Sequence, residues 1–170
     1  MSDAGDAVAA CAEFHREVDE QVAPLATFHG RRLQCRRGCY DCCSDDLTVL
    51  EVEAELIRTR HEALLREQEA GPVGGCAFLD ADGGCRIYAD RPYVCRTQGL
   101  PLRFYDEDDA GEIHEHRDIC PKNLPGLPLA NLDEARCLLL GPSELRLVSL
   151  QMQGFSRMRR VALRDLFLQR

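Results

Sequence analysis

The stretch CRRGCYDCC, residues 35–43, places four cysteines within nine positions, and the last two are adjacent. A loop that joins two cysteines a few residues apart can fold around one ion and bring both sulfurs to it. Cys39-x-x-Cys42 has this spacing, and Cys35-x-x-x-Cys39 is one residue wider. The segment therefore predicts the first part of a thiolate metal site.

The chain has ten cysteines in 170 residues, and four more of them follow in a region rich in loops. Loops offer little core in which a thiol can be hidden, so these cysteines are candidates for the remaining ligands. The predicted metal ligands are Cys35, Cys39, Cys42, Cys43, Cys76, Cys85, Cys95 and Cys120. Cys11 and Cys137 stand in helical apolar patterns instead, and we expect them to be buried small hydrophobes.

The adjacent pair Cys42–Cys43 raises the question of how many ions are bound. In an extended stretch successive side chains point to opposite faces, so the two thiols are poorly placed to chelate one ion together. They can serve two ions, or one ion and the fold. Eight cysteines divide into two four-cysteine sites or into one cluster plus other thiols, and the sequence leaves both open.

Metal is favoured over disulfides by the expected compartment. The first residues, MSDAGDAVAACAEF, have neither the basic nor the apolar segment of a signal peptide, and no apolar run reaches the length of a membrane span. We therefore expect a cytoplasmic protein with reduced thiols. Arginine greatly outnumbers lysine, which is typical of a GC-rich, and so bacterial, genome. The net charge of −8 argues against nucleic acid as a partner.

The apolar pattern predicts an α-rich fold with minor β content: flanking helices around an irregular, cysteine-lined middle with one small β-hairpin. Helices are expected over 6–30 and, broken near Gly141-Pro142, over 131–168, the latter capped by Asn131. Thr48 and Glu51 form a capping-box pattern that predicts another helix start. LPLRFYD and GEIHEHRD predict the hairpin. We expect one domain over 1–170, with a metal-binding core at about 35–120.

Histidines offer a second type of ligand. His114 and His116 lie on the same side of a predicted strand, where a solvated hairpin face is the simpler interpretation. His15, His29 and His61 are expected on helix surfaces, with His29 a candidate extra ligand because it stands six residues before the first cluster cysteine.

Charged residues also occur inside the cysteine-rich loops. Asp80 and Asp82 are expected to be turn residues. Arg91 and Arg96 are expected to donate hydrogen bonds to loop carbonyls or thiolates and to offset the negative charge of the site.

The loop region resembles the YkgJ-like cysteine-cluster family, whose CxxCxxCC domains are described as zinc- or iron-chelating. The resemblance rests on CRRGCYDCC and on CAFLDADGGCRIYADRPYVCR at 76–96, and covers about residues 35–120. The matching positions of the second stretch are Cys76, Leu79-Asp80, Cys85, Ile87-Tyr88, Arg91-Pro92 and Cys95-Arg96. The first spacing departs from the motif because three residues, not two, separate Cys35 from Cys39. The resemblance implies that the chain binds metal.

The sequence leaves three functions open, and whether the protein is an enzyme is undecided. The first is a metal-binding protein that chelates zinc or iron. The second is an iron–sulfur enzyme of methyl transfer or redox chemistry, similar to flagellin lysine N-methylase, which carries a similar cluster. The third is a thiol redox module, which lacks the expected βαβ context. Cys35, Cys39 and Cys42 also match the radical S-adenosylmethionine spacing, but the chain is short for that barrel.

Overall fold

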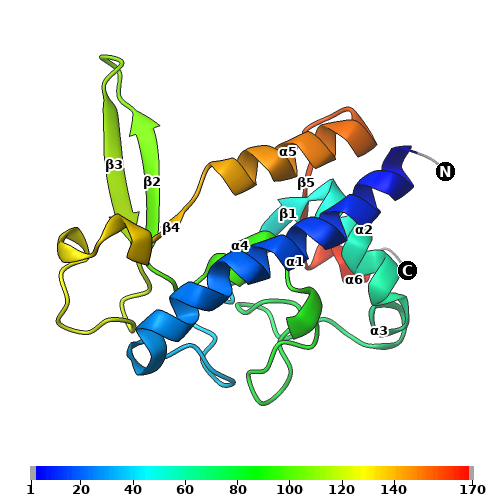
Figure 1. The fold of residues 1–170 in the computed structure, drawn as a ribbon. Helices are drawn as coiled ribbons and strands as arrows, with labels where there is room; N and C mark the ends of the chain where they lie inside the picture. The colour runs from blue at the N-terminus through cyan, green and yellow to red at the C-terminus, as the bar shows by residue number, and fades with distance from the viewer. Residues whose placement is uncertain (1–2, 169–170) are drawn as a thin grey trace. The chain divides into compact units, whose positions relative to one another are not determined.

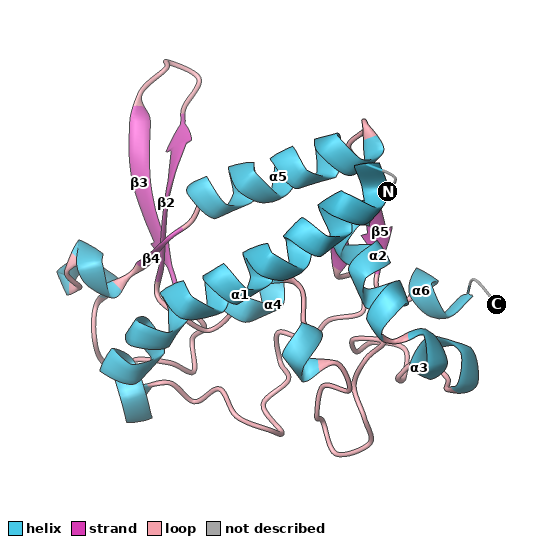
Figure 2. Ribbon diagram, turned by 45° about the vertical axis from the view of Figure 1, so that its right-hand side comes forward, coloured by secondary structure: helices cyan, strands magenta, loops and turns pink. Residues whose placement is uncertain are grey.

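The computed structural model describes residues 3–168 and is helix-rich with minor β content, as predicted (Figures 1 and 2). The α-helices are α1 (Asp3–His29), α2 (Glu51–Arg60), α3 (Glu62–Glu67), α4 (Tyr93–Thr97), α5 (Pro142–Phe155) and α6 (Asp165–Leu168). The strands are β1 (Thr48–Leu50), β2 (Leu102–Glu107), β3 (Ile113–Asp118), β4 (Leu138–Leu139) and β5 (Arg160–Ala162). The stretches between α1 and β1 and between α3 and α4 are mostly loop (Figure 2).

The chain forms two compact units. Unit 1 comprises the residues up to His15, Arg36–Pro92 and the residues from Leu147 onwards. Unit 2 comprises Arg16–Cys35 and Tyr93–Arg146. The sequence predicts one domain over the whole chain, and that expectation stays a prediction.

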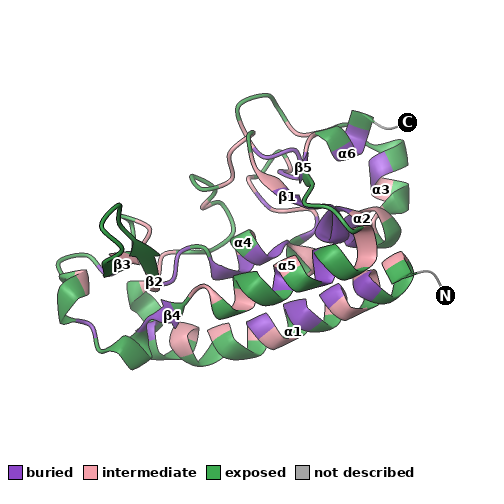
Figure 3. Cartoon of the chain, turned by 90° about the horizontal axis from the view of Figure 1, so that it is seen from above, coloured by how far each residue is buried: buried purple, intermediate pink, exposed green. Residues whose placement is uncertain are grey.

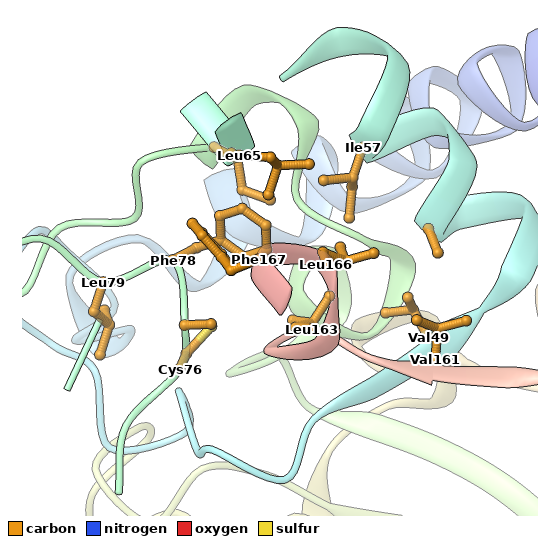
Figure 4. Packing of buried hydrophobic residues seen from close by; sticks show 13 residues of the cluster. Val49, Ile57, Leu65, Cys76, Phe78, Leu79, Val161, Leu163, Leu166 and Phe167 are labelled. Atoms are coloured by element: carbon orange, nitrogen blue, oxygen red, sulfur yellow. The ribbon is translucent and has the colours of Figure 1, made fainter. Parts of the chain in front are cut away.

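Unit 1 is built around a short antiparallel pair, β1 with β5, in which Val49 lies opposite Val161. Apolar side chains from both strands, from α2, α3 and α6 and from the loop after Cys76 pack into one core (Figure 4). The rings of Phe78 and Phe167 lie 5.0 Å apart in this core. The core therefore joins the predicted metal loops to the C-terminal segment.

Unit 2 contains a three-stranded sheet in the order β3-β2-β4. The predicted hairpin is confirmed: β2 pairs with β3 antiparallel, and Phe104 lies opposite His116 (Figure 1). The strand β4 adds to β2 in parallel. A small buried cluster of Leu124, Leu132 and Cys137 lies in the same unit.

Helix α1 confirms the predicted helix over 6–30 and continues past Pro24. The apolar residues Cys11, Phe14 and Val18 are buried, and buried and exposed positions alternate along the helix (Figure 3). The expectation that His15 and His29 lie on the surface is wrong, because each is only 2% exposed.

Both buried histidines have polar partners. His15 Nε2 lies 3.0 Å from a carboxylate oxygen of Glu53, and His29 Nε2 lies 2.8 Å from the carbonyl oxygen of Arg136. These long-range partners make burial of the rings tolerable. The His29 ring therefore serves the fold at the end of α1.

The predicted capping box at Thr48 and Glu51 is wrong. Thr48 lies in strand β1, and α2 begins at Glu51 with no side-chain cap from the preceding residue. The buried side chain of Gln151 supplies the cap instead, because its oxygen accepts a hydrogen bond from the Val52 N–H at 2.9 Å. Thr48 is thus used in strand pairing, and the cap of α2 comes from a residue of α5 rather than from the local sequence.

The predicted helix over 131–168 is also wrong in part. Residues 129–131 and 134–136 form 3₁₀ turns, and the cap in this region is Asp133, whose side chain accepts from the Ala135 N–H, rather than Asn131. Regular helix begins only at α5, and β5 interrupts it again before α6. Cys137 accordingly lies in an extended segment, although it is buried as expected.

Candidate metal centre

Cys39, Cys42 and Cys43 lie on two consecutive turns. The Cys39 N–H donates to the Arg36 carbonyl at 2.9 Å, with Gly38 in the left-handed region at φ 87°. The Cys43 N–H donates to the Tyr40 carbonyl at 2.8 Å. Residues 40–43 therefore form a turn, and the expectation that Cys42 and Cys43 lie in an extended stretch and point to opposite faces is wrong. The side chain of Cys42 is hydrogen-bonded to that of Cys43.

A second loop returns to the first at Cys76. The Cys76 N–H donates to the Cys43 carbonyl at 2.8 Å, so these two residues are held together by backbone. Leu79 and Cys85 then form an antiparallel bridge across the predicted tight turn, in which Gly83 has φ 72°. The turn thus brings the chain back at Cys85 beside the loop that begins at Cys76.

Asp80 organises this turn, as expected. Its carboxylate accepts from the N–H groups of Asp82 and Gly84 at 2.9 and 2.6 Å, and these bonds hold the pKa of Asp80 below its ordinary value. The other carboxylate oxygen accepts from Arg37 at 2.7 Å, which ties the turn to the first cysteine loop. Asp80 is therefore a turn residue, and its oxygens are already used.

The thiols of unit 1 are close enough to influence one another. The pKa of Cys43 is raised to about 12, first by burial and then by the neighbouring sulfurs of Cys42, Cys76 and Cys85. Burial likewise raises the pKa values of Cys76 and Cys85. Removing several protons from such a group requires compensating positive charge, which a divalent cation supplies.

Arginines supply part of that charge from the protein. Arg86 lowers the pKa values of both Cys76 and Cys85 against the effect of burial, and Arg91 also lowers that of Cys85. Arg86 donates to the Ala77 carbonyl at 2.5 Å, but its Nε is buried without a hydrogen-bond partner. The positive charge of Arg86 therefore favours the anionic forms of both thiols.

The two predicted arginine roles differ in outcome. Arg91 donates to the Tyr88 carbonyl at 3.0 Å, as expected for a residue that holds loop carbonyls. Arg96 is 4% exposed and its guanidinium forms an ion pair with Asp19, a helix residue. Arg96 thus contacts α1 within unit 2.

Sequence reasoning missed Arg164, which lies 93 residues from its partner Gly71. Its guanidinium donates to the carbonyls of Gly71, Pro72 and Gly75 at 2.9, 3.0 and 2.9 Å and pairs with Asp45. These contacts hold the segment that enters Cys76. The basic character of the C-terminal segment is the only sequence signal that could have pointed to it.

Three of the predicted ligands belong to unit 2: Cys35, Cys95 and Cys120. Cys95 lies on α4, and Cys120 follows β3. The Asn123 N–H donates to the Cys120 carbonyl at 2.8 Å, and the Asn123 side chain donates to the sulfur of Cys35 at 3.4 Å. Asn123 thereby connects Cys120 with Cys35, and no sequence motif points to it.

Cys11 and Cys137 are both buried, as expected. Cys137 belongs to the small apolar cluster of unit 2, whereas the sulfur of Cys11 lies 4.0 Å from Nε2 of His15, within hydrogen-bond distance for sulfur. The solvated interpretation of the hairpin histidines is also supported: His114 and His116 pair with Asp108 and Asp106 at 2.8 and 2.7 Å on exposed positions.

All ten cysteines lie within the described residues, and all are thiols rather than disulfides. Within residues 3–168, the one group of three potential ligand residues whose ligand atoms all lie within 4.8 Å of one another is Asp108, Glu112 and His114 on the exposed hairpin. No three cysteine sulfurs among these residues lie as close together as this. The candidate ligands range from buried Cys76 to exposed Cys35 and Cys42.

The residues present fit a thiolate-bound ion. The donor set is almost purely sulfur, which suits zinc or iron. The absence of a side chain at Gly99 leaves room for the sulfur of Cys35, because a Cβ on Gly99 would lie 2.3 Å from that sulfur. Unit 1 places thiols on hydrogen-bonded turns near arginines, and unit 2 places the sulfur of Cys35 against an amide. Together with the number of cysteines, these features define a cysteine-rich, metal-chelating class of domain.

A family model confirms this class. It matches residues 34–121 and is described as "CxxCxxCC: Putative zinc- or iron-chelating domain". The chain belongs to this family, and the membership supports metal binding. No curated protein and no solved structure matches the chain. Within residues 3–168, no helix has both the length and the apolar character needed to cross a membrane.

Proposed function

We propose that the protein binds zinc or iron through its loop cysteines and that the metal stabilises the loops that carry them. The proposed ligands are Cys35, Cys39, Cys42, Cys43, Cys76, Cys85, Cys95 and Cys120. A bound ion supplies a cross-link between loop segments that are distant in sequence. The protein residues position the sulfurs and offset their charge.

The observation that carries the proposal is the surroundings of Cys43. Its carbonyl accepts a hydrogen bond from the Cys76 N–H, and its side chain is hydrogen-bonded to that of Cys42. The sulfurs of Cys42, Cys76 and Cys85 also raise the pKa of its thiol. We infer that these four thiols form the nucleus of one centre, with Cys39 beside them on the same pair of turns. Cys35, Cys95 and Cys120 then belong to a second group in unit 2.

The first experiment is metal and acid-labile sulfide analysis, with an absorption spectrum, on protein purified without oxygen. Colourless protein with about two zinc ions per chain indicates closed structural sites. Brown protein with iron and labile sulfide indicates a cluster and moves attention to the enzyme alternative. Protein that takes up neither zinc nor iron, even after reconstitution, would contradict the proposal.

Matched variants locate the site. Cys43→Ala removes a proposed ligand, and Cys137→Ala removes a buried thiol outside it. We expect Cys43→Ala to lose about one metal equivalent, or the cluster, while Cys137→Ala keeps the wild-type content. Equal metal content in both variants would show that Cys43 is not a metal ligand.

Cys39→Ala separates a structural site from a catalytic one. If the metal holds the loops, this variant loses metal and unfolds at a lower urea concentration than the wild type. If the thiols are catalytic, it folds and loses only activity. A Cys39→Ala protein that lacks metal but unfolds at the same urea concentration as the wild type would argue against the structural role.

A further inference from the structure

Asn123 is a buried residue of unit 2, and its side-chain amide forms three hydrogen bonds. The side chain is 4% exposed. Its oxygen accepts from the Gln34 N–H at 2.7 Å, and its nitrogen donates to the Gly99 carbonyl at 2.5 Å and to the sulfur of Cys35 at 3.4 Å. One residue thus connects the segment before Cys35, the turn at Gly99 and the cysteine itself.

The orientation of the amide follows from these partners. If the amide were rotated by half a turn, its oxygen would face the Gly99 carbonyl and its NH₂ would face the Gln34 N–H, so two attractive contacts would become repulsive. The backbone partners therefore select the orientation in which an N–H points at the sulfur. The contact with Cys35 is a consequence of a locked side chain.

Gly99 forms the second wall around this sulfur. It has φ 90°, a conformation that favours glycine, and a Cβ there would lie 2.3 Å from Sγ of Cys35. A Cβ would also lie 3.2 Å from the amide nitrogen of Asn123. Sulfur, backbone and amide are thus packed against one another, although Cys35 as a residue is exposed.

We propose that Asn123 is a positioning residue that holds the sulfur of Cys35 as a metal ligand by donating an N–H to it; this inference rests on the proposed function. An N–H donor stabilises anionic sulfur, whether bound to metal or not, and outer contacts of this kind orient ligands and tune affinity. Arginines perform the charge-offsetting part of this task for Cys76 and Cys85 in unit 1. Cys35 has a neutral amide instead.

The test uses the full chain, loaded with cobalt(II) as the metal probe. Asn123→Ala removes the donor without adding charge, and Asn123→Asp keeps the shape but replaces the donor by a carboxylate oxygen. Asn131→Asp is the matched control, because Asn131 is exposed in the same unit. Each protein is treated with an alkylating reagent, and mass spectrometry reads the modification of every cysteine separately.

In the wild type and in Asn131→Asp, we expect the metal to protect Cys35 and the unit 1 cysteines alike. In both Asn123 variants, Cys35 should become reactive, and cobalt should pass to a competing chelator at least about tenfold faster from the affected site. Cys43 and Cys76 should remain protected, which a general loss of structure would not allow. The sulfur-to-cobalt charge-transfer absorption should fall by the share of one thiolate.

The outcomes are distinguishable. If the Asn123 variants protect Cys35 and release cobalt as the wild type does, the inference is wrong and the proposed function stands. If the wild type binds no metal, the proposed function itself fails. If the variants do not fold, NMR of the wild type loaded with NMR-active cadmium decides: the Asn123 side-chain protons should couple to cadmium through the sulfur, and absence of coupling overturns the inference.

Discussion

Glu51 is a buried carboxylate at the start of α2, and two arginines from the C-terminal segment neutralise it. Arg157 donates to both of its oxygens, and Arg159 donates to one at 2.9 Å. The hydrogen bond from Arg157 is the main cause that places the pKa of Glu51 below its ordinary value of 4.5. The carboxylate therefore stabilises the fold in its charged form.

The pH dependence has a definite sign. Because the folded pKa is depressed, this stabilisation is present above pH 4.5 and is lost as the pH falls through the lower, folded value. We expect Glu51→Gln to reduce the free energy of unfolding at neutral pH by about 1 kcal/mol, a small value because both arginines are half exposed and screened. Urea unfolding at several pH values should show the difference from wild type shrinking in acid. A difference that grows in acid would contradict this assignment.

Substitution of Gly99 tests how closely the protein packs around the sulfur of Cys35. Comparison with Gly126 separates the effect of this packing from the effect of backbone strain. Gly99 and Gly126 both have positive φ, at 90° and 79°, but a Cβ on Gly126 would meet nothing within 4 Å. Substitution by alanine should strain the backbone by about 1–3 kcal/mol at either position. Only Gly99→Ala should also displace the Cys35 sulfur and expose it to alkylation in the metal-loaded protein. Equal Cys35 reactivity in the two variants would show that the contact at Gly99 does not matter.

The residues of the site were predictable from the sequence to an unequal degree. The candidate cysteines could be selected because thiols at knuckle spacing carry their own chemical signal. Asn123 and Arg164 could not, because Asn123 lies 88 residues from Cys35 and Arg164 lies 93 residues from Gly71, and neither residue type is unusual in its local sequence. Long-range hydrogen bonds leave no periodic pattern along a chain.

The start of α2 illustrates the same limit for whole elements. Its local pattern, Thr48 followed by Glu51, matches a capping box, yet the side chain that caps the helix is Gln151, 99 residues from Val52. The hairpin β2–β3 was predictable because its two strands and turn are adjacent in sequence. The pair β1–β5 was not, because β5 is only three residues long and follows α5.

Two adjacent residues of α6, one buried and one exposed, allow a test of packing in the unit 1 core. Phe167 is 4% exposed and its ring packs on Phe78, whereas Leu168 is 73% exposed. We expect Phe167→Ala to reduce the free energy of unfolding by about 3–5 kcal/mol, since it leaves a cavity in the core. Leu168→Ala should change it by no more than about 0.5 kcal/mol. Chemical unfolding measures both, and similar losses for the two would contradict the packing of α6.

Composition and apolar pattern sufficed to predict the helix-rich class but not the division of the chain into two units. Unit 1 takes residues from three separate parts of the chain, and unit 2 takes them from two. Such interleaving depends on contacts between distant segments, which no local pattern reports. The eight candidate cysteines follow the same division, with five in unit 1 and three in unit 2, which agrees with two groups of ligands.

Removal of the metal from the full chain should lower its stability without unfolding it. Unit 1 has an apolar core of its own, so a chelator should lower stability rather than abolish the helices. A metal that binds only the folded state stabilises it by about 4 kcal/mol when its free concentration exceeds the dissociation constant a thousandfold. Since the chain has no tryptophan, far-UV circular dichroism during urea unfolding is the suitable measurement. The metal-free protein should keep its helical signal in buffer and unfold at lower urea.

Cys43→Ala is the control for that experiment, because its unit 1 centre is already broken. Chelator should shift its unfolding midpoint less than that of the wild type, and Cys137→Ala should shift as the wild type does. If chelator leaves the wild-type midpoint unchanged although the metal is gone, the ion does not stabilise the loops. The cysteines would then hold an ion whose energetic role lies outside folding, and the enzyme alternative would gain the support that the family and the fold do not give it.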